Sequence, residues 1–144
     1  MIRHSIARII HAWLASRAEQ HPAPVPIFYH TRPASPASCL AIMEAEGNIH
    51  GRGHKTGKTH ESHGIKVSSR FEGEGAADAA RYGIFWVNSQ LQGPDFKGST
   101  VTIEETTYTL HAAHQYGTIT SLGLPDKTKQ ALYTQDYQIS LQGV

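Results

Sequence analysis

The sequence is poor in cysteine, with Cys39 alone among 144 residues. One thiol cannot form an internal disulfide, which excludes a disulfide-stabilised scaffold and fits a protein assembled in a reducing compartment. A dominant charge sign is also lacking, because 13 Lys and Arg stand against 12 Asp and Glu. Such a chain is no general polyelectrolyte binder, so any contact with nucleic acid must come from a local patch.

Long hydrophobic runs are absent as well. The first 14 residues have an apolar face, but basic side chains interrupt it at Arg3, His4, Arg8 and His11. No apolar run approaches the roughly 20 residues that a bilayer requires. We therefore expect neither a secretory signal nor a membrane span, and no membrane partner.

The most informative stretch is Gly64–Leu91, which predicts a strand, a glycine turn and a long amphipathic helix. Its strand part alternates apolar and polar residues with period two, the pattern of a half-buried strand. From Ala77 onward, apolar residues recur at helical spacing as Ala77, Ala80, Ile84, Val87 and Leu91, with Phe85 and Trp86 widening the stripe. One such helix can cover one face of a sheet.

The first half of the chain adds a helix and two strands. Apolar residues from Ile2 to Leu14 repeat at three and four residue steps, which predicts an N-terminal helix of about five turns. After a proline-rich tract, Val25, Ile27 and Tyr29 favour a strand at a sheet edge. Apolar residues on both parities of Cys39–Glu46 predict a central strand, with Gly64–Phe71 as its antiparallel partner.

The second half adds further strands. Thr100–Tyr108 is rich in β-branched residues and predicts a strand with Val101 and Ile103 facing inward, and a second strand is expected through Tyr108–Thr120. Tyr133–Leu141 predicts a final strand. The expected fold class is α+β: a single two-layer domain over residues 1–144, with a mostly antiparallel sheet packed by one central helix plus the N-terminal helix.

Between the two central strands, Gly47–His63 is predicted to be a long flexible loop that is either mobile or functional. It contains Gly-Lys-Thr at residues 57–59, the ending of a phosphate-binding P-loop. However, three residues separate Gly53 from Gly57 and five separate Gly51 from Gly57, whereas a P-loop has four, and a strand follows instead of a helix. Nucleotide hydrolysis is therefore not expected.

The loop is also rich in imidazoles, at His50, His54, His60 and His63. Neutral imidazole is a common zinc ligand, so a small metal-dependent enzyme is an alternative from another functional class. The spacing matches no zinc module, no cysteine lies nearby, and a glycine-rich loop holds ligands poorly. We expect no metal site, no cofactor and no catalytic residue.

A third interpretation rests on the positive charges of the loop. Arg52, Lys55 and Lys58 could neutralise phosphates without reading sequence. A nucleic-acid-binding accessory protein is accordingly another alternative. Repeated around a closed ring, these charges would also produce a strong field along its axis.

The order of features resembles the tail terminator (minor tail, tail completion) proteins of long-tailed bacteriophages. An N-terminal amphipathic helix and a proline-rich tract precede Cys39–Met43, a long loop, and Ile65–Arg70 leading into the Ala76–Leu91 helix. In that family a strand ending in arginine commonly precedes an alanine-containing helix. The chain commonly closes on a tyrosine-bearing strand, as Tyr137–Leu141 does here.

The resemblance implies a non-enzymatic subunit of a hexameric ring on the head-proximal end of the tail tube. Such a ring stops tube polymerisation and joins the tail to the head connector. Its partners would be copies of itself, the tail tube protein, the head-tail connector protein and, transiently, passing DNA. It would be located in the virion, at the head-tail junction, after assembly in the bacterial host cytoplasm.

The resemblance also suggests which residues act in assembly. The loop would be an assembly or lumen-facing arm, with Arg52, His54, Lys55, Lys58 and His60 as its candidate contact residues. Arg70, Tyr133 and Tyr137 would lie at the subunit interface. Within the same class, the alternatives are another head-tail connector or stopper protein and a tail-tube ring protein.

Overall fold

The computed structural model describes residues 3–18, 21, 25–32, 37–52, 59–122 and 130–143, with the backbone alone for 46–52, 59–60 and 122. This part of the chain contains two helices and six strands. In chain order they are α1 (Ile6–Ala15), β1 (Ile27–Tyr29), β2 (Cys39–Arg52), β3 (Thr59–Glu72), α2 (Ala76–Leu91), β4 (Thr100–Ile103), β5 (Thr106–Leu122) and β6 (Gln130–Gly143).

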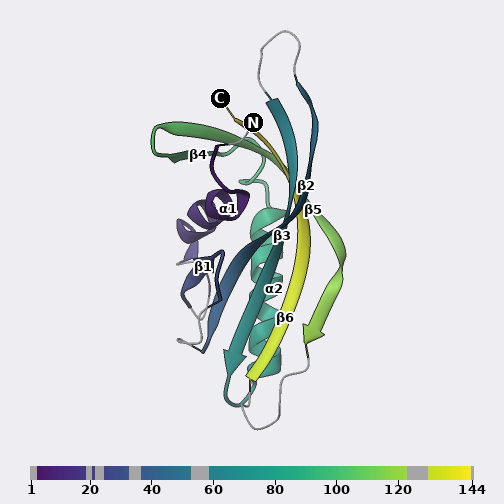
Figure 1. Ribbon diagram of the computed structural model, residues 1–144. Coiled ribbons are helices and arrows are strands. Elements are labelled where there is room, and N and C mark those ends of the chain that lie inside the picture. Colours follow the sequence, from purple (N-terminus) through teal and green to yellow (C-terminus); the bar gives the residue numbers. More distant parts are fainter. Residues whose placement is uncertain are drawn as a thin grey trace.

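The strands form one curled sheet in the order β1-β2-β3-β6-β5-β4 (Figure 1). The short β1 is parallel to β2, and the pairs β2–β3, β3–β6, β6–β5 and β5–β4 are antiparallel. The predicted α+β class, the mostly antiparallel sheet and the two helices are confirmed. β1 lies at a sheet edge, as expected for the segment between Val25 and Tyr29.

Helix α2 packs on β3 and β6 and defines the inner face of the sheet. Alternate β3 residues such as Ile65 and Val67 are fully buried beneath it, which confirms the predicted period-two strand. The helix buries most of its predicted stripe, but Ala77 is exposed and Phe85 is 59% exposed. Phe85 therefore faces away from the sheet, contrary to the expectation that it widens the buried stripe.

Helix α1 is shorter than predicted because it begins at Ile6 rather than Ile2. The Ser5 hydroxyl accepts a hydrogen bond from the Arg8 N–H, and the Glu44 carboxylate accepts one from the Ile6 N–H at 3.0 Å. These acceptors satisfy two of the amides that a helix start leaves unpaired. The buried side chains of the helix are Ile6, Ala7, Ile9, Ile10, Trp13 and Leu14. Each large one stabilises the fold by about 1.5–3 kcal/mol.

The predicted loop Gly47–His63 is wrong over most of its length, because β2 continues to Arg52 and β3 begins at Thr59. The pairing register of β2 with β3 shifts between Glu44 and Gly47 and again between Ile49 and Gly51. Glycine inside a strand commonly marks such a bulge, so its presence here did not indicate a loop. Residues 53–58 lie outside the described residues.

The strand predicted at Thr100–Tyr108 is a hairpin instead. Glu104 and Glu105 have positive φ values of 47° and 73° and form the turn between β4 and β5. Two-residue turns of this kind usually carry Asn-Gly or Asp-Gly, so Glu-Glu gave no turn signal. Val101 and Ile103 are each 7% exposed, which confirms that both face inward. The strands expected around Leu110 and at Tyr133–Leu141 are also confirmed.

Gly83 is the point where α2 lies closest to the sheet. A Cβ added there would overlap Ser69 Oγ and would stand 3.1 Å from Leu40 Cδ2. We expect Gly83→Ala to lower the free energy of unfolding by about 1–3 kcal/mol, because overpacking outweighs the better helix propensity of alanine. Urea unfolding followed by circular dichroism measures this loss.

The matched control is Gly83→Ala combined with Ser69→Ala. The Ser69 hydroxyl is buried and has no hydrogen-bond partner in the described residues, so its removal opens the space at little cost. We expect the double variant to recover part of the lost stability. A double variant as unstable as Gly83→Ala alone, or more so, contradicts the close contact.

Candidate functional site

The basic loop predicted as a contact arm lies mostly outside the described residues. This holds for His54, Lys55 and Lys58 entirely. Arg52 and His60 are described by their backbones, which pair Arg52 with Thr59 and Gly51 with His60 at the ends of β2 and β3. A contact role for these residues stays a prediction.

Arg70, predicted at a subunit interface, is 9% exposed and is engaged within its own chain. Its Nε donates to the Ala37 carbonyl at 2.6 Å, and its Nη2 lies 3.6 Å from Cys39 Sγ. Burial raises the pKa of the Cys39 thiol, while Arg70 and Arg32 act in the opposite direction. Arg70 therefore fixes the connection between β1 and β2 to the outer face of the sheet.

Tyr137, the second predicted interface residue, lies inside the core. It is 1% exposed and its hydroxyl donates to Asn88 Oδ1 at 3.2 Å, which ties β6 to α2. Burial raises the pKa of the Tyr137 hydroxyl. A side chain enclosed in this way offers no surface to a neighbour, so the structure disagrees with the prediction. Tyr133 is half-buried, and its interface role stays a prediction.

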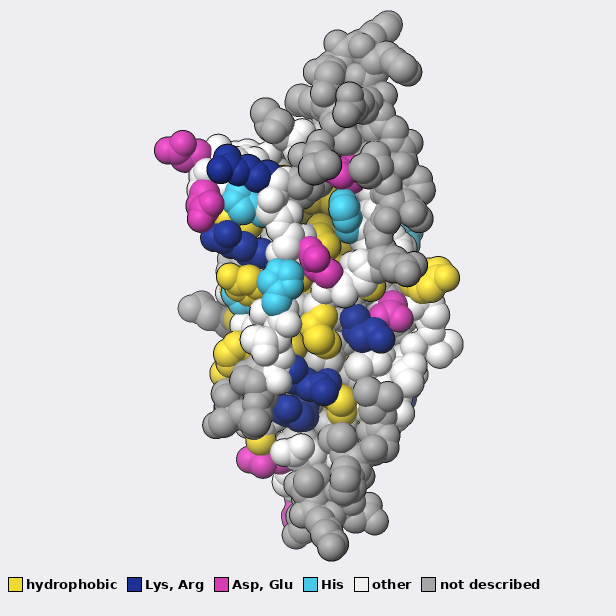
Figure 2. Space-filling view, in the orientation of Figure 1, with side chains coloured by type: hydrophobic (Ala, Val, Ile, Leu, Met, Phe, Trp, Pro, Cys, Tyr) yellow, Lys and Arg dark blue, Asp and Glu magenta, His cyan; other side chains and the backbone are white. Residues whose placement is uncertain are grey.

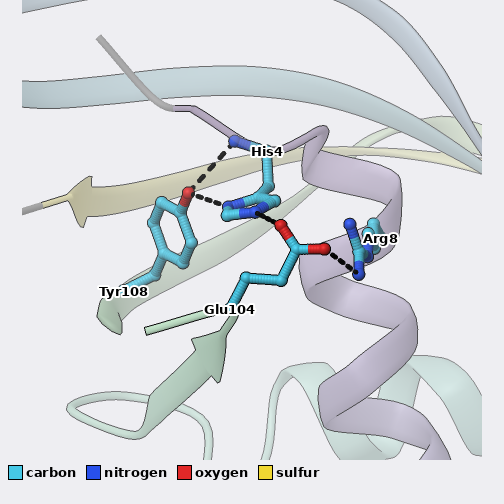
Figure 3. A network of polar contacts seen from close by, with 4 residues as sticks. All are labelled: His4, Arg8, Glu104 and Tyr108. Carbon is cyan, nitrogen blue, oxygen red and sulfur yellow. Dashed lines mark hydrogen bonds and ion pairs between the residues drawn. The ribbon is translucent and has the colours of Figure 1, made fainter. Parts of the chain in front are cut away.

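The start of α1 is fastened to the β4–β5 hairpin by a chain of polar contacts (Figure 3). The His4 N–H donates to the Tyr108 hydroxyl at 3.0 Å, and His4 Nδ1 lies 2.5 Å from the same oxygen. His4 Nε2 lies 3.3 Å from Glu104, which also pairs with Arg8 at 3.6 Å. The hydrogen bond to His4 and the charge of Arg8 lower the pKa of the Glu104 carboxyl.

The same helix is fastened to β1 and its flanking residues near the opposite edge of the sheet. Ser5 Oγ lies 2.7 Å from His30 Nε2, and His11 Nε2 donates to the Ile27 carbonyl at 2.8 Å. Since β1 and β4 are the two end strands of the sheet, α1 contacts both of its ends. We call this arrangement the α1 clamp: the contacts of α1 with the β4–β5 turn and with β1.

The polar groups of the clamp bond to one another and hold α1 against the sheet. Tyr108 is fully buried and cannot meet a substrate, and His4 is occupied on both ring nitrogens. Within the described ranges, no three His, Cys, Asp or Glu side chains are grouped so as to hold a metal ion. Neither described helix is long and apolar enough to cross a membrane.

The short end strands leave long stretches of their neighbours unpaired. As far as the chain is described, β1 pairs with β2 over Leu40–Ile42, and β4 pairs with β5 over Thr106–Thr109. Beyond these segments, β2 from Met43 and β5 from His111 each have one neighbouring strand among the described residues. In Figure 1 the distal part of β5 forms one margin of the sheet. These two unpaired strand margins are the open edges.

The open edge of β5 lacks the charges and the proline that often protect an edge strand. No Lys, Arg, Asp or Glu occurs in Thr106–Leu122, and residues 114–118 together with 120–121 are exposed. Monomeric proteins discourage edge pairing with charges, proline or very short strands. A long uncharged edge is therefore typical of a strand that pairs with another chain.

A second candidate surface lies on the outward side of α2. Tyr82 and Phe85 are 41% and 59% exposed, with ring centroids 5.8 Å apart. The buried His21 ring packs edge-on against Tyr82 and Trp86. Exposed aromatic pairs are enriched in protein interfaces.

The described surface is otherwise mixed in charge. In Figure 2, Lys and Arg side chains lie among Asp and Glu on the face toward the viewer. Lys66 and Asp136 on neighbouring strands approach to 3.9 Å. A face with both signs interspersed provides no strong field for a polyanion.

With this geometry established, the fold can be compared with known proteins. Neither a protein-family model nor a curated protein matches this sequence. The fold is similar to that of a virion chain. That solved structure, the virion of a native gene transfer agent particle, contains a chain matched with a TM-score of 0.56 and 12% identity, over 96% of this chain and 98% of that one. At this identity the similarity establishes the fold.

Sequence reasoning missed the residues of the clamp. Glu104 was placed inside a strand, because Glu-Glu carries no turn signal, and His4 was noted only as an interruption of an apolar face. The lack of charge in Thr106–Leu122 was visible in the sequence and is the signal that could have marked β5 as an edge strand.

Glu104→Gln tests the clamp through its pH dependence. A lowered folded-state pKa means that the ionised carboxylate stabilises the fold above its ordinary pKa of about 4.3, and that this contribution is lost as the pH falls through the folded value. We expect wild type to exceed Glu104→Gln in stability at pH 7, with the gap closing toward pH 3. Chemical denaturation across this range measures the gap.

The neighbouring Glu105→Gln is the matched control, because no described contact involves the Glu105 carboxylate. It should lack the pH-dependent gap. A gap of equal size in both variants would show that the net charge, rather than the bond to His4, is responsible.

Proposed function

We propose that this protein is a structural subunit of a bacteriophage-type virion that forms a ring at the head-proximal end of a tail tube. The ring terminates tube polymerisation and joins the tail to the head connector. The subunit acts through its shape and has no catalytic role. The fold similarity to a virion chain over nearly the full length of both chains is the observation that carries the proposal.

The open edges supply an independent physical argument for self-assembly. Counting across the sheet, β2, β3, β6 and β5 alternate in direction, so β5 runs opposite to β2. A second copy placed alongside without inversion therefore sets its β2 edge antiparallel to β5 of the first. Because the two edges differ, the contact is heterologous, and its repetition produces a ring where the rotation between copies closes.

The remaining partners follow from this position. The tail tube protein would contact one end of the ring and the head-tail connector protein the other, and DNA would pass through the opening. Arg52 at the end of β2, together with Lys55 and Lys58 in the segment that follows it, would serve as the assembly or lumen-facing arm. The protein would be located in the virion after assembly in the host cytoplasm.

The mass of the purified full-length protein tests the proposal. Size-exclusion chromatography with light scattering should show a closed oligomer, a hexamer of the 15.8 kDa chain, at high concentration. Negative-stain images of that fraction should show rings. A monomer at all concentrations, with and without tail tubes, would contradict the ring-forming function.

Binding to isolated virion parts distinguishes the terminator from the related ring proteins. We expect the purified protein to cosediment with tail tubes and to stop their elongation in a polymerisation assay. Cosedimentation with connector rings and no effect on tube length would instead favour a connector or stopper.

A further inference from the structure

The outer margin of β5 is divided by a bulge. Its ladder with β6 pairs Tyr116 with Asp136 and resumes at Thr120 with Thr134, so three β5 residues stand opposite one β6 residue. Gly117 takes a φ of 75° within this segment. A bulge bends a strand and ends regular pairing, so it separates β5 into a proximal and a distal part.

In the proximal part and at the bulge itself, side-chain amides donate to backbone carbonyls of β5. Gln135, 1% exposed, donates through Nε2 to the carbonyls of Tyr116 at 3.1 Å and Gly117 at 3.4 Å. Gln92, which ends α2, donates to the Ala113 carbonyl at 2.6 Å. Carbonyls of consecutive residues in a regular strand point to opposite sides. The carbonyls of Tyr116 and Gly117 both accept from Gln135, so they do not alternate. A second strand pairing along this edge would therefore lack one of its regularly spaced acceptors.

The distal part beyond the bulge is better suited to pairing. Its ladder with β6 covers residues 120–122, and Ile119 packs against the core of its own subunit. Thr118 and Thr120 are exposed, and the Thr120 hydroxyl donates to the Thr118 carbonyl at 3.3 Å. The Thr-Ile-Thr sequence has high β propensity. No described side-chain amide caps the carbonyls of residues 119–121.

We propose that copies of this chain join through the distal part of β5, Ile119–Leu122, and not through the part before the bulge. The partner is the open edge of β2 in a second copy, from Met43 onward, which runs antiparallel to it. Gln135 is the positioning residue, because its amide holds the bulge that ends the capped segment. This inference rests on the ring-forming function proposed above.

Two acidic substitutions on opposite sides of the bulge test the proposal. Thr120 and His114 are both exposed and pair with β6 residues of the same parity, so they lie on one face of β5. Thr120→Glu adds a buried charge to the proposed contact, and we expect association to weaken about a hundredfold or more. His114→Glu adds the same charge before the bulge and should change association by less than about threefold.

Hydrogen exchange of the assembled and dissociated full-length protein locates the contact independently. We expect amides in Ile119–Leu122 and in the open edge of β2 to exchange at least about tenfold more slowly after assembly, and those of Ala112–Gln115 to be unchanged. In Gln135→Leu, we expect Ile119–Leu122 and Ala112–Gln115 to show the same change in exchange on assembly. The free energy of unfolding of the Gln135→Leu monomer, measured in parallel, shows whether the variant still folds.

The outcomes separate this inference from the proposed function. Assembly with protection spread along all of β5, or equal weakening by Thr120→Glu and His114→Glu, overturns the distal contact and leaves ring formation standing. Slower hydrogen exchange in β5 without slower exchange in β2 would show that β2 is not the partner of β5. Failure of the wild-type protein to assemble at all overturns both.

Discussion

The structure depends on the contact of one helix with both ends of a single sheet. Helix α1 is joined to the β4–β5 turn through Arg8 and through His4, which directly precedes the helix, and it is joined to β1 through His11. Its apolar side chains fill the space that the curled sheet leaves on its inner face. Because the two end strands are held by the same helix, the sheet keeps its curl with end strands of three and four residues.

This arrangement explains why the chain is at once well packed and incomplete. The inner face is covered by α1 and α2, and its buried tyrosines find partners within the chain: Tyr108 bonds His4, and Tyr137 bonds Asn88. The margins of the sheet, formed by β2 and β5, are not covered in this way. End strands of three and four residues cannot cover β2 and β5 along their length, so parts of both strands have no second neighbouring strand within the described residues. We propose that copies of the chain complete these edges, because an unprotected edge strand is a template for pairing with another chain.

Much of the fold could be predicted from the sequence, because a strand or helix with one buried face carries apolar residues at a regular spacing. The alternation around Ile65 and the helical spacing from Ala80 to Leu91 are of this kind. What failed depends on single contacts. Glu104 and Glu105 form a turn without turn residues, since Glu104 bonds His4 across the molecule. Tyr137 was placed at an interface from family resemblance, whereas the parity of β6 turns it inward.

The most direct test of this account is a cryo-electron microscopy reconstruction of the assembled protein. The account predicts that the sheets of adjacent copies join edge to edge, through β5 of one and β2 of the next, with α1 still holding both end strands of its own sheet. Copies joined through Tyr82 and Phe85 on α2, with the edge of β5 left in solvent, would contradict it.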